Sequence, residues 1–493
     1  MRTIERVLTA GAVILGSFAV TPSALAGTIS VTTTTDQFNT GTECSLREAV
    51  EAANTDADFG GCTGAAAGPD TITLPAGTYT LTIAPTPDGN ADGDLLIESD
   101  ITLDPTGAVR IDGGMIDRVF SVGSAGALTA SDLTITRGVT PDEGAAILSG
   151  GSLTLTGVTL TGNQAGFGGG AISNGAGTVT LRNVTISGNQ AGGDGGGLNN
   201  VAGTATLNNV TFTDNVADSD ADGIGDGGGL RADAGTVTIH NTLLGGNQDK
   251  STGADPNHPD CSGSVSSGGY NLIQDADGCT LGGTLTGNIT GANPQLMGLA
   301  DNGGPTPTHA LRKGSPAVDA GNPASPGSSA TACETTDQRG IPRPQGPRCD
   351  IGSFEREQPS EVTCLGRPVT MTGTSGNDVL TGTPKRDVIR ALGGDDVIDA
   401  LGGNDRVCAG AGNDRVNGRS GRDVVAGGAG NDRVRGAGGD DDLRGQGGRD
   451  RLKGKGGDDV LRGGPEPDNL NGGAGTDTCR GGGGRDRIRR CEG

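Results

Sequence analysis

The sequence has no tryptophan and few aromatic side chains of any kind. Of its 493 residues only two are Tyr and seven are Phe, so aromatic residues make up 2% of the chain. Compact globular cores normally contain more large side chains than this. Glycine, in contrast, occurs 95 times. This composition excludes an ordinary globular core and leaves a disordered chain or a thin solenoid, which an internal period distinguishes.

Residues typical of zinc sites and catalytic triads are also scarce. The sequence contains three His, at positions 240, 258 and 309, and no C-x-x-C pair, which argues against a zinc site. The His residues show no Ser/His/Asp spacing, so we expect structural roles for them.

Basic residues are in deficit over most of the chain, which has a net charge of −23. Up to Cys364 there are 39 acidic and 15 basic residues, whereas from Leu365 onward there are 20 acidic and 21 basic residues. An acidic body argues against nucleic acids and anionic membranes as partners. The change in charge predicts a domain boundary near residue 360.

Long apolar runs are absent after the first 26 residues. Residues 1–26 have the features of a secretory signal peptide: Arg2 and Arg6, an apolar stretch over 7–20, and an A-x-A site at 24–26. The alternative is an uncleaved anchor helix, but the apolar stretch is short for a bilayer span. We therefore expect a secreted, extracellular or cell-surface protein without a transmembrane segment.

Ten Cys residues suit an oxidising compartment. Sequence alone does not fix disulfide connectivity, and the simplest hypothesis joins neighbours along the chain. The expected pairs are Cys44–Cys62, Cys261–Cys279, Cys333–Cys349, Cys364–Cys408 and Cys479–Cys491.

A strict nine-residue period runs from Gly373 to Arg489. Thirteen units follow without a gap, for example GTSGNDVLT (373–381). The eighth position of every unit is apolar, and the fourth is Gly in eleven units, with exceptions at Lys385 and Glu466. The sixth position is Asp in all thirteen units: Asp378, Asp387, Asp396, Asp405, Asp414, Asp423, Asp432, Asp441, Asp450, Asp459, Asp468, Asp477 and Asp486.

These units resemble the RTX (hemolysin-type) calcium-binding repeat G-G-x-G-x-D-x-U-x, in which U is apolar. The resemblance implies a parallel β-roll with two nonapeptides per coil, and calcium held between stacked turns by Asp carboxylates and backbone carbonyls. Positions seven and nine should face water. Glycine lets carbonyl oxygens approach a hard cation. Since the ion would offset repulsion between carboxylates, we expect calcium binding and folding to be coupled.

Two nonapeptides per coil would stack Asp residues eighteen apart in two columns. One column begins Asp378, Asp396, Asp414, Asp432, and we expect it to hold the tightest sites. Arg precedes the Asp at positions 386, 422, 449 and 485, where a guanidinium would compete with calcium. The other expected ligands are Asp405, Asp423, Asp441, Asp450, Asp459 and Asp477, with Asp387, Asp468 and Asp486 as weaker candidates. The alternative is a β-roll held together by Asp–Arg pairs without metal.

A looser repeat of about 26 residues occupies the body of the chain. Four segments align, at 153–165, 179–191, 205–217 and 237–249. Alternating apolar and Thr residues predict short strands, and the period predicts a right-handed parallel β-helix. The short GGAI and TFTDN-like elements resemble repeats of polymorphic outer membrane proteins. Side-chain amides that share one place in the repeat could stack, namely those of Asn163, Asn189, Asn215 and Asn247.

Two flanking segments resemble parts of secreted β-helix proteins. CSLREAVEAAN (44–54) resembles the CSLREA motif, which implies a helix that caps the first coil, with a structural ion-pair role for Arg47 and Glu48. Residues 301–323, with 337–344 and 349–355, resemble a choice-of-anchor segment. The expected domains are a signal peptide (1–26), a CSLREA cap (27–67), a parallel β-helix (68–300), an anchor-type segment that closes it (301–360) and a calcium-binding β-roll (361–493) with nonapeptides over 373–489.

An acidic loop, DSDADGIGD (218–226), begins like a calcium-binding loop. Asp218, Asp220 and Asp222 follow the D-x-D-x-D-G pattern, but Gly229 stands at the twelfth position, where a bidentate acid is expected. Bound calcium and a solvated acidic loop both fit this pattern.

The sequence as a whole favours an all-β, calcium-stabilised protein exported from a bacterium, with a non-catalytic surface or adhesive role. A cell-surface or matrix polysaccharide is a candidate partner. The alternative is an extracellular polysaccharide lyase or hydrolase carried on the β-helix. Such sites usually need aromatic platforms and a carboxylate pair, whereas Tyr79 and Tyr270 are the only Tyr and no such pair stands out. A pore-forming toxin would need a long insertion region, which the sequence lacks.

Overall fold

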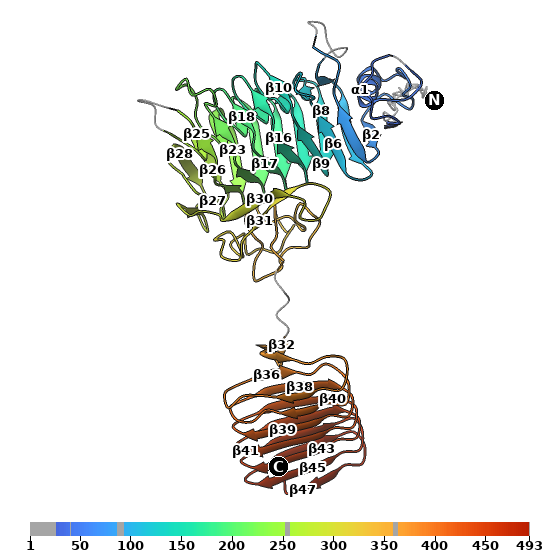
Figure 1. Cartoon of the computed structure of the whole chain (residues 1–493), viewed down its shortest axis with the longest axis vertical. Coiled ribbons are helices and arrows are strands. Elements are labelled where there is room, and N and C mark those ends of the chain that lie inside the picture. Colours follow the sequence, from blue (N-terminus) through green and yellow to red (C-terminus); the bar gives the residue numbers. More distant parts are fainter. Residues whose placement is uncertain (1–25, 40, 86–92, 252–256, 358–362, 493) are drawn as a thin grey trace, which may run out of the picture. The chain divides into compact units, whose positions relative to one another are not determined.

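The computed structural model describes residues 26–39, 41–85, 93–251, 257–357 and 363–492. The predicted signal peptide lies outside these ranges except for its last residue. The chain divides into two compact units, Met1–Glu357 and Gln358–Gly493, which are described separately (Figure 1). Both consist of stacked parallel strands, which confirms the predicted all-β solenoid class. Within the described ranges no helix has the length and apolar character that crossing a bilayer requires.

The first unit is a parallel β-helix with four short strands in each complete coil. The first ladder contains β1 (Gly27–Ser30), β2 (Asp70–Leu74), β5 (Asp100–Pro105), β8 (Ala127–Ser131), β12 (Ser152–Thr156), β16 (Thr178–Arg182), β20 (Thr204–Asn208), β23 (Leu230–His240), β26 (Cys261–Ser267) and β28 (Cys279–Gly283). The second ladder contains β4 (Leu95–Ile97), β7 (Phe120–Val122), β11 (Ile147–Ser149), β15 (Ile172–Asn174) and β19 (Leu198–Asn200), and it joins the first at β23.

The other two ladders complete the coil. The third contains β3 (Gly77–Thr80), β6 (Val109–Asp112), β9 (Leu133–Thr136), β13 (Thr159–Thr161), β17 (Thr185–Ser187), β21 (Thr211–Thr213), β24 (Leu243–Leu244), β27 (Leu272–Ile273) and β29 (Ile289–Thr290). The fourth contains β10 (Val139–Thr140), β14 (Gln164–Ala165), β18 (Gln190–Ala191), β22 (Val216–Ala217) and β25 (Gln248–Asp249).

The core of this unit consists of side chains stacked in register. Leu160, Ile186, Phe212 and Leu244 are partners on adjacent strands, and all four are fully buried. Their spacing follows the sequence repeat. Each such side chain contributes about 1.5–3 kcal/mol to folding by leaving water, so long rows of aliphatic residues replace the aromatic residues that the chain lacks.

The stacked amides form a continuous ladder inside the β-helix. The Nδ2 of Asn163 donates to the Oδ1 of Asn189 at 2.9 Å, and the same bond joins Asn189 to Asn215 and Asn215 to Asn247. The ladder ends at Asp260, whose Oδ1 accepts from the Nδ2 of Asn247. These bonds satisfy buried polar groups that would otherwise destabilise the interior.

The first coil is covered by α1 (Leu46–Thr55), which contacts β1, β2, β4 and β5. The helix begins at Ser45, whose side chain accepts from the backbone of Glu48, while Glu48 accepts from the backbone of Ser45 in a capping box. Arg47 is buried and forms an ion pair with Asp36 at 2.8 Å. Both residues therefore have structural contacts.

Residues 301–357 lie against the third ladder. This segment contains β31 (Thr308–Leu311), which pairs antiparallel with β30 (Leu296–Ala300). Its polar side chains bond to the outward Thr residues of the ladder: the Oγ1 of Thr185 donates to the Oε1 of Gln338 at 2.6 Å, and the Oγ of Ser353 donates to the Oγ1 of Thr211 at 3.1 Å. The segment thereby covers this face of the β-helix.

The second unit is a β-roll of two seven-stranded parallel sheets. The first sheet contains β34 (Met371–Thr372), β36 (Val388–Arg390), β38 (Arg406–Ala411), β40 (Val424–Ala429), β42 (Asp442–Gly447), β44 (Val460–Gly464) and β46 (Thr478–Gly482). The second contains β35 (Val379–Thr381), β37 (Val397–Asp399), β39 (Arg415–Ser420), β41 (Arg433–Gly438), β43 (Arg451–Gly456), β45 (Asn469–Ala474) and β47 (Arg487–Arg489). A small hairpin, β32 (Thr363–Cys364) and β33 (Arg367–Pro368), precedes them.

Strand partners within each sheet are eighteen residues apart, as two nonapeptides per coil require. For example, Val434 pairs with Leu452 on the next strand, and both side chains face the interior. The eighth position is buried from Ile389 to Cys479, whereas Leu380 and Ile488 in the terminal coils are partly or largely exposed. The period therefore predicted both the register and the inward face.

Five disulfides close loops along the chain, and the described residues contain no free Cys. The bonds join Cys44–Cys62, Cys261–Cys279, Cys333–Cys349, Cys364–Cys408 and Cys479–Cys491. They are the pairs expected from the order of Cys residues along the sequence.

Candidate metal centre

The turns of the β-roll depend on glycine at the fourth position of the nonapeptide. Gly430, for example, has a φ of 126°, which side chains of L-residues rarely adopt. A Cβ atom there would lie less than 3 Å from the carbonyl oxygen of Gly412, one coil earlier. Glycine is thus required both by the left-handed conformation and by the close approach of successive turns.

Glycine at the first position makes room for the carboxylate. At Gly445 a Cβ atom would lie less than 3 Å from the Oδ2 of Asp450 and 2.7 Å from the carbonyl oxygen of Gly463. The same two kinds of oxygen converge at Gly454, from Asp459 and from Gly472. Turns of this kind therefore have a small space, beside the first glycine, towards which a carboxylate and a carbonyl oxygen both point, whereas three units have Ala at that position, namely Ala391, Ala400 and Ala409.

The other carboxylate oxygen joins the coils. The backbone N–H of Asp414 donates to the Oδ1 of Asp432 at 2.9 Å, and the N–H of Asp432 donates to the Oδ1 of Asp450 at 2.9 Å. This pattern runs through both columns, from Asp378 to Asp486 in one and from Asp387 to Asp477 in the other. The Oδ1 atom of every sixth-position Asp from Asp396 to Asp486 is thus fixed by the fold.

The second oxygen is buried and has no hydrogen-bond partner in ten of the thirteen units. These unpartnered Oδ2 atoms belong to Asp396, Asp405, Asp414, Asp423, Asp432, Asp441, Asp450, Asp459, Asp468 and Asp477. Buried polar atoms without partners are rare and costly in native proteins. Their regular recurrence therefore points to a ligand that carries positive charge.

Three Asp residues at the ends of the columns differ from these ten. The Oδ2 atoms of Asp378 and Asp387 accept hydrogen bonds from Thr374 and Thr383 within their own turns, and Asp486 in the last coil is partly exposed. The structure thus separates terminal from interior units. The sequence-based ranking, which placed Asp378 among the tightest sites, stays a prediction.

Burial raises the pKa of the stacked carboxyls. Loss of hydration is the main cause, and repulsion from neighbouring Asp residues adds to it. The pKa is raised to about 7 at Asp432, Asp441 and Asp450. It is raised to about 6 at Asp405 and Asp459. Burial thus disfavours the charged form of these groups, whereas a bound cation would favour the carboxylate.

Arginine does not supply the missing charge. Among residues 363–492 the ion pairs join Arg419 to Asp399, and Arg444 and Arg462 to Asp442. None of these involves an Asp at the sixth position. The geometry thus argues against the alternative of a β-roll held by Asp–Arg pairs. Carboxylate and carbonyl oxygens are instead the donor set that calcium prefers.

The residue before each Asp forms an outer ladder. The Oδ1 of Asn413 accepts from the N–H of Asn431, and the Oδ1 of Asn431 accepts from the N–H of Arg449, both at 2.9 Å. Arg cannot accept a hydrogen bond, so the ladder ends where Arg449 stands. The next residue in that column is Pro467, which has no N–H and needs no acceptor.

Two further acidic clusters lie in the first unit. The carboxylates of Asp218, Asp220 and Asp222 lie within 4.8 Å of one another, but both oxygens of Asp218 already accept backbone N–H bonds. Asp226, Asp249 and His258 form a similar group, which sequence reasoning missed because its members belong to different coils. In that group Asp226 already pairs with Arg231 and with His258.

Another residue that the sequence did not single out is Glu492. Its Oε2 accepts from the backbone N–H of Asp477 at 2.7 Å, so it completes the column that begins at Asp387. Glu492 lies fifteen residues after Asp477 instead of eighteen, outside the nine-residue period. The only signal in the sequence was an acidic residue shortly after the last unit.

Comparison with protein families agrees with this geometry. The family model of the RTX calcium-binding nonapeptide repeat matches residues 372–407, 400–434, 409–443, 417–452, 435–466 and 453–488. The second unit therefore carries RTX calcium-binding repeats, which cover about a quarter of the chain. A search of curated proteins found no match to the sequence.

Proposed function

We propose that the chain is an exported calcium-binding β-solenoid whose C-terminal repeats fold on binding calcium, and that its role is that of a non-catalytic surface or adhesive protein. The observation that supports calcium binding most directly is the set of ten buried, unpartnered Asp oxygens. The Oδ1 atom of each of these Asp residues already accepts a backbone hydrogen bond, so only the Oδ2 atom is free to bind an ion.

The residues that would hold calcium are the interior Asp carboxylates and the carbonyl oxygens of first-position glycines, such as Asp450 and Gly463. The ion supplies two positive charges, which offset carboxylate repulsion within the stack. Ordering many glycines is costly in entropy, so binding that occurs only in the folded state would stabilise the repeats. Low cytosolic and high extracellular calcium would then restrict folding to the outside of the cell.

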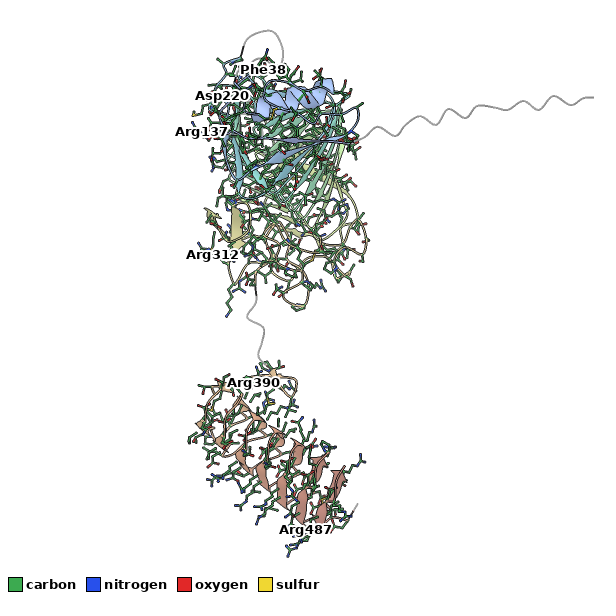
Figure 2. The ribbon with its side chains drawn as sticks, turned by 90° about the vertical axis from the view of Figure 1, so that its right-hand side faces the viewer. Phe38, Arg137, Asp220, Arg312, Arg390 and Arg487 are labelled. Atoms are coloured by element: carbon green, nitrogen blue, oxygen red, sulfur yellow. A yellow bond between two sulfur atoms is a disulfide. The ribbon has the colours of Figure 1, made fainter. Side chains whose placement is uncertain are left out.

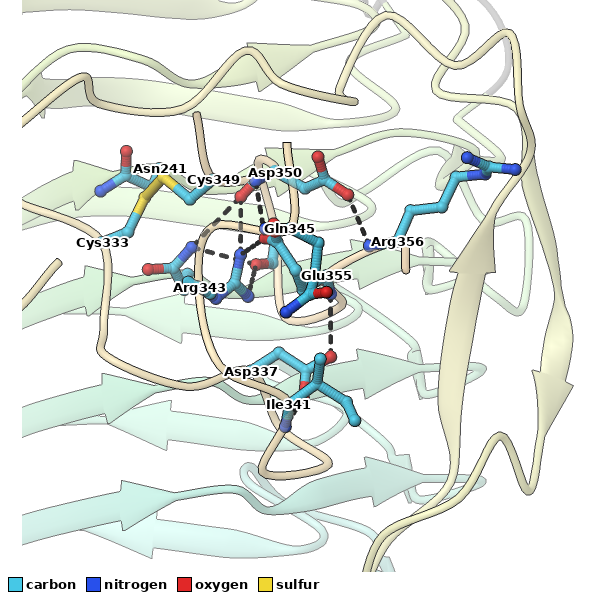
Figure 3. A network of polar contacts seen from close by, with 12 residues as sticks. Asn241, Cys333, Asp337, Ile341, Arg343, Gln345, Cys349, Asp350, Glu355 and Arg356 are labelled. Carbon is cyan, nitrogen blue, oxygen red and sulfur yellow. Dashed lines mark hydrogen bonds and ion pairs between the residues drawn. A yellow bond between two sulfur atoms is a disulfide. The ribbon is translucent and has the colours of Figure 1, made fainter. Parts of the chain in front are cut away.

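A non-catalytic role is supported by the way the acidic residues of the anchor-type segment are used. Figure 3 shows the buried network around Arg343, Asp350 and Glu355. The Oε2 of Glu355 accepts from the N–H of Asp350 at 2.8 Å and from Arg343 at 3.0 Å. Asp350 accepts from the backbones of Asp319 and Arg356. These carboxyls are buried and bind partners within the segment itself, so they hold its loops together.

The resemblance of residues 44–54 to the CSLREA motif and of 301–355 to a choice-of-anchor segment supports the same proposal. In this view α1 and the anchor-type segment close the β-helix, and the signal peptide directs export. We also propose the loop with Asp218, Asp220 and Asp222 as a weaker calcium site, since its three carboxylates approach one another.

Calorimetry and hydrogen exchange on the full chain test calcium binding. We expect heat on adding calcium and none on adding magnesium, together with slower amide exchange over residues 373–489. Peptides from the β-helix outside residues 218–226 serve as an internal control and should not change. Asp441→Ala should weaken both responses, whereas Asp442→Ala should not, because the half-buried carboxylate of Asp442 pairs with Arg444 and Arg462. Equal exchange of the repeats in calcium and in chelator would refute the proposal.

A further inference from the structure

One sheet of the β-roll carries basic side chains that no acidic side chain pairs with. We define the basic face as the exposed residues Arg415, Arg433, Arg435, Arg451, Lys453, Lys455, Arg487 and Arg489. They project from β39, β41, β43 and β47 (Figure 2, in which Arg487 is labelled). The ion pairs found over residues 363–492 involve none of them.

These cations stand in register. Arg415, Arg433 and Arg451 are successive partners across the sheet, and Arg435 is the partner of Lys453. Adjacent strands are about 4.8 Å apart, and like charges directly opposite one another destabilise a sheet. Repulsion between the positive charges within these rows therefore destabilises the folded β-roll.

The repeat does not need these cations for its fold. In the other sheet the seventh position is Val388, Val424 and Val460 in three of the six units, which alternate with Arg406, Asp442 and Thr478. Apolar residues are thus compatible with this place in the coil. Since a row of Arg costs stability there, a role in binding is the better explanation.

A groove runs along the edge of the basic face. It has a volume of about 570 Å³, and its lining includes Arg433, Arg449, Arg451, Arg485 and Arg487. The sixth-position carboxylates of three successive coils also line it. If calcium neutralises these carboxylates, as proposed above, the groove gains net positive charge. The inference about the basic face therefore rests on the proposed function in one respect, namely the binding of calcium to these carboxylates.

We infer that the basic face binds a linear anionic polysaccharide, a polymer of uronic acids, with its chain running along the stack of coils. One sugar of such a polymer extends roughly as far as the spacing between strands, so carboxylates that face the sheet can meet its rows of basic residues at regular intervals. Single-stranded nucleic acid is a less favourable ligand, because proteins that bind it use aromatic stacking and residues 365–493 contain no Phe, Tyr or Trp.

The test measures binding of hexagalacturonate to the full chain by calorimetry, with its methyl ester as the uncharged control ligand. The variant Arg433→Ser/Arg451→Ser removes two members of the basic face. The matched control, Arg462→Ser/Arg480→Ser, removes two exposed arginines from the other sheet. Calcium binding is measured for each protein, in order to separate loss of the sugar site from loss of the calcium sites.

We expect binding of the acid but not of its ester, with affinity that falls at high salt and in chelator. The basic-face variant should bind about tenfold more weakly, as expected for two exposed ionic contacts, while it still binds calcium. The control variant should match the wild type. Calcium-loaded protein that does not bind hexagalacturonate, or equal losses in both variants, would overturn the inference. Tighter binding of a single-stranded oligonucleotide or of phosphatidylserine vesicles would do the same.

If the calcium proposal is wrong but the polysaccharide inference is right, the measurements will give a different combination of results. The chain would then show no heat with calcium, yet it would bind hexagalacturonate in a manner that depends on Arg433 and Arg451. In that case the basic face would stand as a polysaccharide site, and its expected enhancement by calcium would be wrong.

Discussion

Replacing buried carboxyls by amides should have opposite effects on the metal-free and the metal-bound β-roll. The variant Asp432→Asn/Asp441→Asn/Asp450→Asn keeps the shape of each side chain but removes its charge. Burial raises the pKa of all three carboxyls to about 7 in the absence of metal. An Asn amide at the same place would be neutral, and its N–H groups could donate towards the nearby glycine carbonyl.

The sign of the pH effect follows from proton linkage. Between the ordinary Asp pKa of 3.8 and about 7 the folded state holds more protons than the unfolded state, so metal-free stability falls as pH rises through this window. One pKa unit corresponds to about 1.4 kcal/mol, which gives about 4 kcal/mol for each group. Solvent screening reduces this figure, and we expect about 5 kcal/mol for the three groups together.

Differential scanning calorimetry of the full chain in calcium-free buffer measures this difference. Wild-type repeats should melt more than about 10 °C lower at pH 8 than at pH 5, whereas the difference should be clearly smaller in the triple variant, in which Asp405 and Asp459 still titrate with a pKa of about 6. At pH 8 the variant should be the more stable protein without calcium and the less stable one with it. Asp442→Asn is the matched control, because it changes a carboxyl beside Asp441 that is only half-buried and pairs with Arg444 and Arg462. A wild-type melting temperature that does not depend on pH would refute the reasoning.

Three further perturbations test other parts of the structure. Gly430→Ala should destabilise the β-roll by more than about 2 kcal/mol in urea unfolding, because Gly430 has a left-handed conformation and contacts the preceding coil. Gly447→Ala should be tolerated, because no atom would lie closer than 3.7 Å to the new Cβ. Asn189→Ala removes four hydrogen bonds of the amide ladder and should cost about 2–4 kcal/mol in the same assay, whereas Ala at the exposed Gln190 should cost little. Peptide mapping without reduction should recover the five disulfides between neighbouring Cys residues; crossed links would contradict this.

The β-roll was predictable because its rules are local. Nine residues define a turn and a strand, and the eighth position faces inward wherever the unit is repeated. Register then follows from the period, so Val434 and Leu452 could be placed on adjacent strands before the structure was known. The amide ladder of the β-helix was predictable for the same reason, since Asn163 and Asn189 occupy one place in the repeat.

Contacts between distant segments could not be predicted in this way. The bond between Thr185 and Gln338 joins residues 153 positions apart, and no period relates them. The group of Asp226, Asp249 and His258 likewise depends on how loops of different lengths fold back. The two oxygens of one Asp also look alike in a sequence, and only the stacked backbone shows that Oδ1 has a partner and Oδ2 does not.

The arginines of the β-roll raised the question of whether they replace calcium, and their positions argue that they do not. Arg449 precedes Asp450, yet the Oδ2 of Asp450 has no hydrogen-bond partner, and no ion pair joins the two among the described residues. Arg449 is exposed, whereas Asp450 is buried. Asp450 is fixed in the stack by the hydrogen bond from the backbone of Asp432 to its Oδ1, and the exposed Arg449 in the same turn leaves its Oδ2 without a partner. The tract can therefore be rich in arginine and still keep its carboxylates for calcium, and its basic groups remain available to a ligand outside.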